Sequence, residues 1–252
     1  MIEIHSHILP GIDDGAQSKE ESLEMAFQAV EQGITDIIAT PHHGDGTFET
    51  PPNIVRRHVE ALNEWYNRNE VPVKVHAGQE IRVHAELMDD WEREQLLTLA
   101  GSRYILIELP SSHVPSYMND LIHELRVRGL VPVIAHPERN KEIASSPGIL
   151  GTWIEHGALC QVTSHSLTGY FGRKVQRLSL QLCRDRMIHF VSSDAHHYQQ
   201  RAFALQAAIR SIERSLGWEI VDRFRENGER LLRNEAIEAG APNRARRKRF
   251  FW

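Results

Sequence analysis

Seven short apolar segments recur along the chain, separated by longer segments of mixed polarity. Each is rich in Val, Ile or Leu and is short for a buried helix, so it predicts a buried β-strand. The predicted strands cover residues 1–4, 34–40, 71–78, 104–109, 130–135, 159–163 and 188–191.

The intervening segments carry the signals of helices. Ser18 and Glu21 form a capping box at the start of the first helix, which Gly33 ends. Pro51 and Pro52 open the second. Helices are predicted at residues 18–32, 51–69, 85–94, 114–128, 149–156 and 173–186, and the segment from residue 201 onward is predicted to be helical.

The alternation of strands and helices predicts an α/β protein with a parallel sheet. Seven such units favour a closed, TIM-like (β/α) barrel, and a doubly wound open sheet is the alternative. Residues 1–240 are expected to form one domain that ends in helices, followed by a tail at residues 241–252. In a barrel, active residues lie at the C-terminal ends of the strands.

Composition narrows the class of protein further. The 252 residues are 41% hydrophobic and 25% charged, as in ordinary soluble globular proteins. The formal net charge of −5 argues against a nucleic-acid partner. No apolar run approaches the roughly 20 residues of a membrane span, and the chain begins with a strand rather than a signal peptide. We therefore expect a cytoplasmic protein.

The two cysteines do not suggest cysteine chemistry. Cys160 and Cys183 are too few for a disulfide framework, which agrees with a reducing compartment. A cysteine-based phosphatase needs Cys-x5-Arg, but Ser166 and His189 stand six residues after the two cysteines. Both cysteines are predicted to be core residues.

Metal-ligating side chains follow most of the predicted strands. His5 and His7 are two residues apart at the end of the first strand, so their imidazoles point the same way and suit a divalent metal. Two surface histidines are the alternative. Asp194 and His196 repeat this spacing after the last strand. The candidate ligands are His5, His7, Asp14, His42, Glu80, Glu108, His136, Asp194 and His196.

Glu108 is the most informative of these nine residues. It lies within an apolar run, where a carboxylate is costly to bury without a partner. A metal ion would supply that partner, and a salt bridge to an arginine is the alternative. Nine nitrogen and oxygen donors exceed the needs of one ion and predict two or three.

Two arginines follow the strand-end motifs closely. Arg139 comes after the fifth strand and Arg201 after the seventh. A guanidinium binds phosphate through two parallel hydrogen bonds, so arginines beside a metal cluster predict a phosphate-ester site. Ordinary surface arginines are the other interpretation.

These motifs resemble the PHP (polymerase and histidinol phosphatase) family over nearly the whole chain, to about residue 235. The motifs that carry the resemblance are His5-x-His7, Pro41-His42, Glu80, His136-Pro137 and Ser193-Asp194-Ala195-His196. The longer stretches at residues 5–15, 40–43, 78–81 and 135–140 resemble the manganese-dependent protein-tyrosine phosphatases of Gram-positive capsule and exopolysaccharide operons, the CpsB/YwqE type.

The resemblance implies a distorted seven-stranded barrel with three metal ions. His5, His7, Glu80 and Asp194 would hold the first, and Glu80 would bridge to a second held with Glu108 and His136. The third set would be Asp14, preferred over its neighbour Asp13, with His42 and His196. The ions are expected to be Mn²⁺, with Fe, Zn, Co or Mg as other candidates.

Two carboxylates favour the tyrosine-phosphatase branch of the family. Histidinol-phosphate phosphatases resemble a pattern with His at the positions of Asp14 and Glu108, and additional carboxylates favour harder ions such as Mn²⁺ over Zn²⁺. The expected mechanism places the phosphate against the metals with Arg139 and Arg201 on its outer oxygens. A metal-bound hydroxide is then the nucleophile, without a covalent enzyme intermediate.

The resemblance implies a tyrosine-phosphorylated protein as the substrate: the tyrosine-rich C-terminal tail of a bacterial tyrosine kinase and the proteins that this kinase modifies. The other interpretations are a small-molecule phosphatase such as histidinol-phosphate phosphatase, an amidohydrolase, and a regulatory module that binds phosphotyrosine without turnover. Against the amidohydrolase stands the absence of the bridging Lys that many of those enzymes carry, since Glu108 and His136 are found instead.

The tail differs from the rest of the chain. Residues 244–249 read RARRKR and are followed by Phe250, Phe251 and Trp252. Basic residues next to aromatic ones predict weak contact with an anionic membrane surface at the inner face of the membrane, or with an acidic partner. A solvated, partly disordered terminus is the other interpretation.

Overall fold

Parallel strands lie at the centre of the protein and follow one another in chain order. The computed structural model describes residues 1–242, in which the strands form a three-stranded sheet, β1-β2-β4, and a six-stranded sheet, β3-β5-β6-β7-β8-β9. The strands are β1 (Ile2–Ser6), β2 (Asp36–Ala39), β3 (His42–His43), β4 (Lys74–Ala77), β5 (Glu80–Arg82), β6 (Tyr104–Glu108), β7 (Val131–Ala135), β8 (Leu159–Thr163) and β9 (Phe190–Ser192).

The chain passes from the three-stranded sheet to the six-stranded sheet twice, each time directly after a predicted strand. β2 is followed by β3 after Pro41, which has no N–H to donate to a continuous ladder. β4 is followed by β5 after Gly78, where a Cβ would lie 2.9 Å from Cγ2 of Ile38. The second and third predicted strands correspond to β2 and β4, and the short strands β3 and β5 that follow them were not predicted.

The first and last strands meet at their C-terminal ends. Ser6 and Ala195 form a parallel bridge, the Asp194 N–H donates to the His5 carbonyl at 2.9 Å, and the His7 N–H donates to the Ala195 carbonyl at 2.8 Å. The predicted α/β class and parallel pairing are confirmed. The closed barrel is not, because the strands divide between two sheets and β1 joins β9 through a bridge rather than a full ladder.

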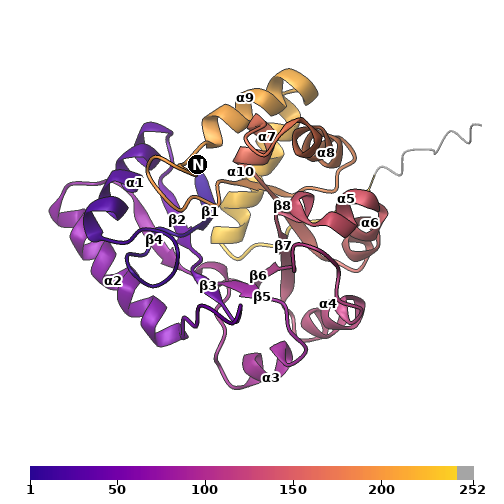
Figure 1. The fold of residues 1–252 in the computed structure, drawn as a ribbon, viewed down its shortest axis with the longest axis horizontal. Coiled ribbons are helices and arrows are strands. Elements are labelled where there is room, and N and C mark those ends of the chain that lie inside the picture. Colours follow the sequence, from indigo (N-terminus) through magenta and orange to yellow (C-terminus); the bar gives the residue numbers. More distant parts are fainter. Residues whose placement is uncertain (243–252) are drawn as a thin grey trace, which may run out of the picture.

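Helices surround the strands, and Figure 1 shows them as an outer layer that follows the chain around the molecule. Two 3₁₀ turns, η1 (Leu99–Gly101) and η2 (Pro137–Arg139), complete the elements. The helices are α1 (Lys19–Glu31), α2 (Pro52–Arg68), α3 (Leu87–Glu92), α4 (Met118–Val127), α5 (Lys141–Ser145), α6 (Gly148–Glu155), α7 (Ser164–Thr168), α8 (Arg173–Arg184), α9 (Leu205–Leu216) and α10 (Trp218–Leu232).

Most predicted helices are present, with differences at their ends. The Ser18 hydroxyl accepts a hydrogen bond from the Glu21 N–H at 3.2 Å, which is one half of the predicted capping box. The Glu21 carboxylate accepts the Gln17 N–H at 2.8 Å in place of the Ser18 N–H. The segment from residue 201 is not one helix, because Gly217, at φ 94°, separates α9 from α10 and the described chain beyond Leu232 is irregular. α5 and α7 were not predicted, since both are short.

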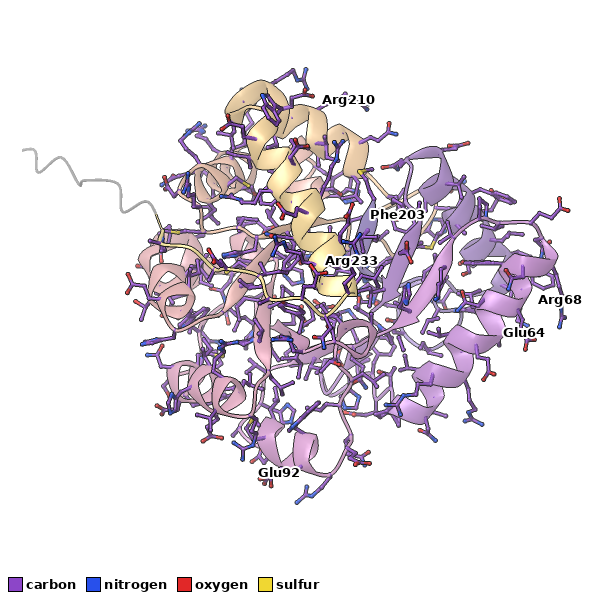
Figure 2. The ribbon with its side chains drawn as sticks, turned by 180° about the vertical axis from the view of Figure 1, so that it is seen from behind. Glu64, Arg68, Glu92, Phe203, Arg210 and Arg233 are labelled. Carbon is purple, nitrogen blue, oxygen red and sulfur yellow. The ribbon has the colours of Figure 1, made fainter. Side chains whose placement is uncertain are left out.

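Helix α10 covers the end of the sheets at which the strands begin, opposite to their C-terminal ends. It crosses the strands in the view from behind (Figure 2) and contacts β1 and β9. Gly228 permits the close approach, because a Cβ there would lie 3.3 Å from Cβ of Ile2. Leu231 is fully buried in an apolar cluster that includes Ile4, Leu106 and Phe190.

No helix within residues 1–242 has the combined length and apolar character that a membrane crossing requires. The prediction made for residues 244–252 lies outside the described residues.

Replacing Leu231 with Ala should lower the free energy of unfolding by about 2–5 kcal/mol, because a fully buried leucine leaves a cavity between α10 and the strands. Urea denaturation measures this change. Val127→Ala on α4 is the matched control, since Val127 is 70% exposed and should change stability by less than about 0.5 kcal/mol. Equal effects of the two changes would contradict the packing of α10 described above.

Candidate metal centre

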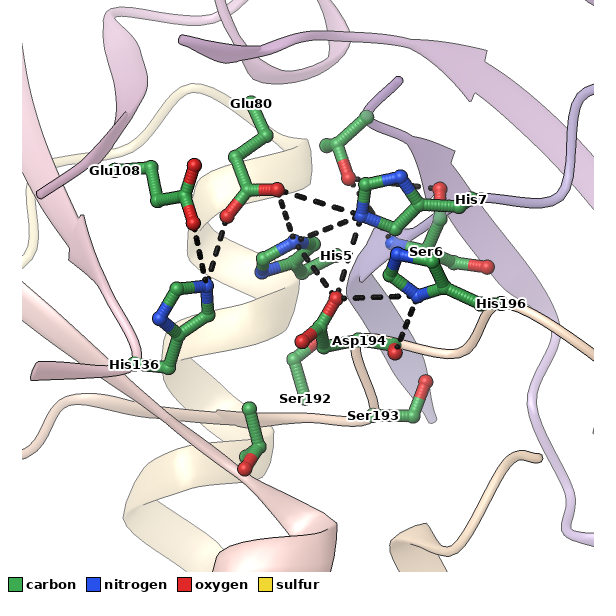
Figure 3. Close-up of polar contacts among 12 residues, drawn as sticks. His5, Ser6, His7, Glu80, Glu108, His136, Ser192, Ser193, Asp194 and His196 are labelled. Atoms are coloured by element: carbon green, nitrogen blue, oxygen red, sulfur yellow. Dashed lines mark hydrogen bonds and ion pairs between the residues drawn. The ribbon is translucent and has the colours of Figure 1, made fainter. Parts of the chain in front are cut away.

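All nine predicted ligands lie together near the C-terminal ends of the longer parallel strands. His5 is in β1 and Glu108 ends β6, while His42 and Glu80 follow β2 and β4 and begin the short strands β3 and β5. The others follow β1, β7 and β9 or lie in the first loop. Because the strands are parallel, these ends meet at one edge of the sheets. Figure 3 shows ligands from the ends of several strands converging, among them His5, Glu80 and Asp194.

The first group places four donor atoms at almost equal spacing. His5 Nε2 and His7 Nε2 are 3.3 Å apart, and each lies 3.3–3.4 Å from Glu80 Oε2 and Asp194 Oδ1. Ligands arranged tetrahedrally at about 2.0–2.2 Å from an ion are separated by roughly 3.3–3.6 Å. The spacing therefore fits one metal ion.

Glu80 extends the cluster to a second group. Its Oε1 lies 2.9 Å from His136 Nε2, while its Oε2 belongs to the first group and also lies 2.9 Å from His42 Nδ1. Glu108 is the other carboxylate here, 3.8 Å from His136 and 4.0 Å from His42. The two carboxylate oxygens of Glu80 thus face different groups of donors, and His42 lies near both groups.

The third group surrounds Asp14. Its Oδ1 lies 3.3 Å from His196 Nε2 and 3.5 Å from His42 Nε2. The rings of His7 and His196 stack with centroids 3.7 Å apart, so this group is continuous with the first. Asp14 is about half exposed, unlike the buried ligands around it.

Several of these donor atoms are buried without a hydrogen bond. Each lies near another donor, but the angles are wrong for hydrogen bonding, as expected when the atoms point toward a common centre. The atoms are His42 Nδ1, Glu80 Oε2, Glu108 Oε2, Asp194 Oδ1 and His196 Nε2. Burial of a polar atom without a hydrogen bond raises the free energy of the folded protein, and a metal ion bound between these atoms would remove that penalty. The residues present therefore fit metal ions well.

The charges in the site also call for a cation. Burial raises the pKa of Glu108 to about 7, and the charge of Glu80 adds to the rise. Burial and the neighbouring Arg139 lower the pKa of His136 to about 4, which keeps its ring neutral and able to bind a metal. The salt bridge to an arginine, which was the alternative predicted for Glu108, is present as well, since Arg82 Nη2 lies 2.7 Å from Glu108 Oε2.

Two residues that the sequence analysis did not predict orient the histidines from behind. Asp13 Oδ2 lies 2.7 Å from His7 Nδ1 and also accepts the His42 N–H at 3.1 Å. Gln161 Oε1 lies 3.2 Å from His5 Nδ1 and 3.3 Å from the His136 backbone nitrogen. Such partners fix which ring nitrogen faces the metal. The adjacent Asp13 and Asp14 in sequence gave a signal for the first, whereas Gln161 gave none.

Glu3 holds two ligand-bearing segments together, and it was also not predicted. Its carboxylate is fully buried and accepts hydrogen bonds from the His5 N–H at 3.1 Å and the Ser193 N–H at 3.0 Å. The Ser192 hydroxyl also donates to it, and that hydroxyl in turn accepts the Ile4 N–H at 3.1 Å. Glu3 thereby fixes β1 against β9 directly behind His5 and Asp194.

The two predicted arginines converge on one ligand. Arg139 Nη1 and Arg201 Nη2 each lie 2.6 Å from Asp194 Oδ2, while the other oxygen of Asp194 faces the first metal group. Each arginine side chain is about 30% exposed, so part of each is accessible to solvent. This is an arrangement for binding an anion beside the metals.

The backbone is unusual at these positions. His136, Asp194 and Arg201 have φ values of 30°, 54° and 51°, in a region that residues other than glycine seldom occupy. Such conformations cluster at functional sites, where the surrounding structure holds them.

Parallel strands that end in converging histidines and carboxylates define an α/β protein with a candidate metal-binding site. The family model for capsular polysaccharide synthesis, CpsB/CapC, matches residues 1–233, and the chain belongs to this family. It is 45% identical over 251 residues to the tyrosine-protein phosphatase YwqE of Bacillus subtilis, covering 100% of this chain and 99% of YwqE. It is 27% identical over 243 residues to the tyrosine-protein phosphatase CpsB of Streptococcus agalactiae serotype III, covering 94% and 100%.

Solved structures agree with this assignment. A crystal structure from work on YwqE of B. subtilis and CpsB of Streptococcus pneumoniae, described as unique metal-dependent tyrosine phosphatases, matches with a TM-score of 0.95 and 45% identity. The match covers 98% of this chain and 100% of the other. A β-aspartyl dipeptidase from Fervidobacterium islandicum AW-1 matches with a TM-score of 0.56 at 11% identity over 96% of this chain and 75% of the other, a likeness of fold alone.

Replacing Asp13 with Asn should weaken metal binding by about 10- to 100-fold, because the amide does not hold His7 in the required tautomer as a carboxylate does. Titration of the metal-free protein with Mn²⁺ against a chelating dye measures the affinity. Asp120→Asn, on the exposed surface of α4, is the matched control and should have no effect. Undiminished affinity in the Asp13 variant would show that this carboxylate does not orient His7.

Proposed function

We propose that this protein is a metal-dependent phosphotyrosine-protein phosphatase. The observation that carries the proposal is the convergence of buried donor atoms without hydrogen bonds beside two arginines that share Asp194. The tyrosine-phosphatase relatives support the substrate class. On the same basis we propose a bacterial tyrosine kinase and its targets as substrates, in the regulation of capsule or exopolysaccharide synthesis.

Three groups of residues would hold the metal ions. His5, His7, Glu80 and Asp194 form the first, and Glu80 with Glu108 and His136 forms the second. The third consists of Asp14, His42 and His196. Four carboxylates among nine ligands favour Mn²⁺ over softer ions. When bound, such ions activate water as a nucleophile and offset the charge of the phosphate.

The chain's own residues bind and orient the substrate. Arg139 and Arg201 are fixed through Asp194, and their remaining N–H groups would hold the outer oxygens of the phosphate. The cysteines take no part, because both are fully buried and burial raises the pKa of each thiol well above its usual range. A covalent phosphocysteine is therefore not expected.

Histidinol-phosphate hydrolysis is a less favoured function for this site. The resemblance places histidines, in that branch, at the positions of Asp14 and Glu108, and both carboxylates lie among the other ligands here. We also propose that the two sheets, joined at Ser6 and Ala195, act as one distorted barrel that presents the site.

The test is phosphate release from a phosphotyrosine peptide and from histidinol phosphate, with Mn²⁺ and after chelation. We expect Mn²⁺-dependent release from the peptide alone. Arg139→Ala and Arg201→Ala should each lower kcat/KM by on the order of 100-fold while metal content is retained, because each removes a donor to the phosphate.

Cys160→Ser is the control for this experiment and should keep its activity. Loss of activity in that variant with metal still bound would overturn the proposed chemistry. Release from histidinol phosphate alone would assign the protein to the other branch. Binding of the phosphopeptide without turnover would identify a regulatory module.

We propose, further, that the basic and aromatic residues at 244–252 bring the protein to the inner face of the membrane. Each Lys or Arg near an anionic surface contributes about 1 kcal/mol of attraction. The full chain should therefore sediment with vesicles that contain phosphatidylserine, and less so as salt is raised. A chain truncated after Pro242 should not sediment with them, and equal binding by both chains would rule out this role.

A further inference from the structure

We propose that Tyr170 and Phe171 form a subsite for the aromatic ring of the substrate and make the enzyme selective for aryl phosphates. The inference rests on the proposed phosphatase function and concerns the opening of the same site. Its evidence is a chain of contacts that runs from Asp194 through Arg139 to the two aromatic side chains.

Phe171 packs directly on an arginine of the site. The guanidinium carbon of Arg139 lies 5.2 Å from the centre of the Phe171 ring, while Nη1 of the same group lies 2.6 Å from Asp194. Arg139 thus presents one face to an aromatic ring and its edge to the site, and this arrangement stabilises the cation. A phosphate held by that edge lies beside the aromatic side chain.

Tyr170 continues this surface outward. Its ring contacts Phe171 edge-on, with centroids 5.2 Å apart and an interplanar angle of 86°. It also contacts His165 edge-on at 5.1 Å, and His165 Nδ1 lies 3.4 Å from the carbonyl of Ser193, next to Asp194. Tyr170 is nevertheless 62% exposed, so much of its ring remains available to a ligand.

The turn that carries the two aromatics is held in place by its backbone. Gly169 and Gly172, at φ 90° and 93°, flank the pair between α7 and α8 in conformations that favour glycine. The Tyr170 N–H donates to the His165 carbonyl at 3.0 Å, and the Gly172 N–H donates to the Gly169 carbonyl at 2.9 Å. An exposed aromatic ring on a fixed turn loses little conformational freedom when a ligand binds it.

This geometry suits phosphotyrosine better than phosphoserine or phosphothreonine. In phosphotyrosine a ring separates the phosphate from the peptide backbone, so a phosphate beside Arg139 places that ring at the opening, where Tyr170 and Phe171 lie. Aromatic rings attract one another in edge-on and offset arrangements. An alkyl phosphate has no group that makes these contacts.

The test compares two ligands that differ only beyond the phosphonate group. Phenylphosphonate and methylphosphonate are titrated into the Mn²⁺-loaded full-length protein by calorimetry. The native protein should bind phenylphosphonate more tightly. Tyr170→Ala should weaken phenylphosphonate binding by about three- to tenfold and leave methylphosphonate binding unchanged.

Two further variants complete the design. Phe171→Leu keeps an apolar side chain under Arg139 but removes the ring, and it should also weaken phenylphosphonate selectively. Trp218→Ala is the matched control, because Trp218 is a similarly exposed aromatic, at 63%, on the first turn of α10. It should bind both ligands as the native protein does.

Three outcomes would overturn the subsite. The native protein could bind the two phosphonates equally, Tyr170→Ala could leave both affinities unchanged, or it could weaken both alike, which would show an effect through Arg139. Failure of the proposed phosphatase function is a separate result, seen as absent phosphotyrosine hydrolysis by the native protein before any variant is compared.

Discussion

The buried negative charge at the C-terminal ends of the strands is the constraint on which the rest of the structure depends. Glu80, Glu108 and Asp194 lie within one cluster, and burial of a carboxylate in such an environment is unfavourable without a compensating cation. Arginines compensate part of this charge, since Arg82 forms an ion pair with Glu108. Arg139 and Arg201 form ion pairs with Asp194. Glu80 Oε2 and Asp194 Oδ1, which face His5 and His7, remain without hydrogen bonds, and a bound metal ion would satisfy them.

The scaffold around this cluster fixes its members before any ion binds. Glu3 ties β1 to β9, Asp13 and Gln161 hold the ring nitrogens that face away from the centre, and the 2.9 Å hydrogen bond from Asp194 to the His5 carbonyl joins the first strand to the last. Ligands held in this way lose little freedom when they bind a metal. The positive φ angles of His136 and Asp194 indicate that the surrounding contacts, rather than local preference, set the positions of these two side chains.

Arg139 connects the three parts of the site. Its edge meets Asp194, its face meets Phe171, and its charge helps to keep His136 neutral. The metal ligands, the guanidinium edge of Arg139 and the aromatic pair of Tyr170 and Phe171 are therefore not independent features. A substitution at Tyr170 or Phe171 can affect the metal ligands through the guanidinium group of Arg139. For this reason, a change in affinity for aryl ligands is informative only when the affinity for alkyl ligands stays the same.

The sequence by itself determined the α/β alternation, the position of each predicted ligand at a strand end, and the pairing of metal donors with arginines. These follow from local pattern, because apolar runs and the residues directly after them are contiguous in the chain. Only the tertiary structure decided the division of the strands into two sheets, where Pro41 and Gly78 separate β2 and β4 from the short strands β3 and β5. It also decided the hydrogen bonds of Glu3 and Gln161 and the position of Tyr170 against His165 and Phe171. Glu3 and Gln161 depend on partners far away in sequence, and Tyr170 lies on a surface that only folding creates. Such relations leave no periodic signal along the chain.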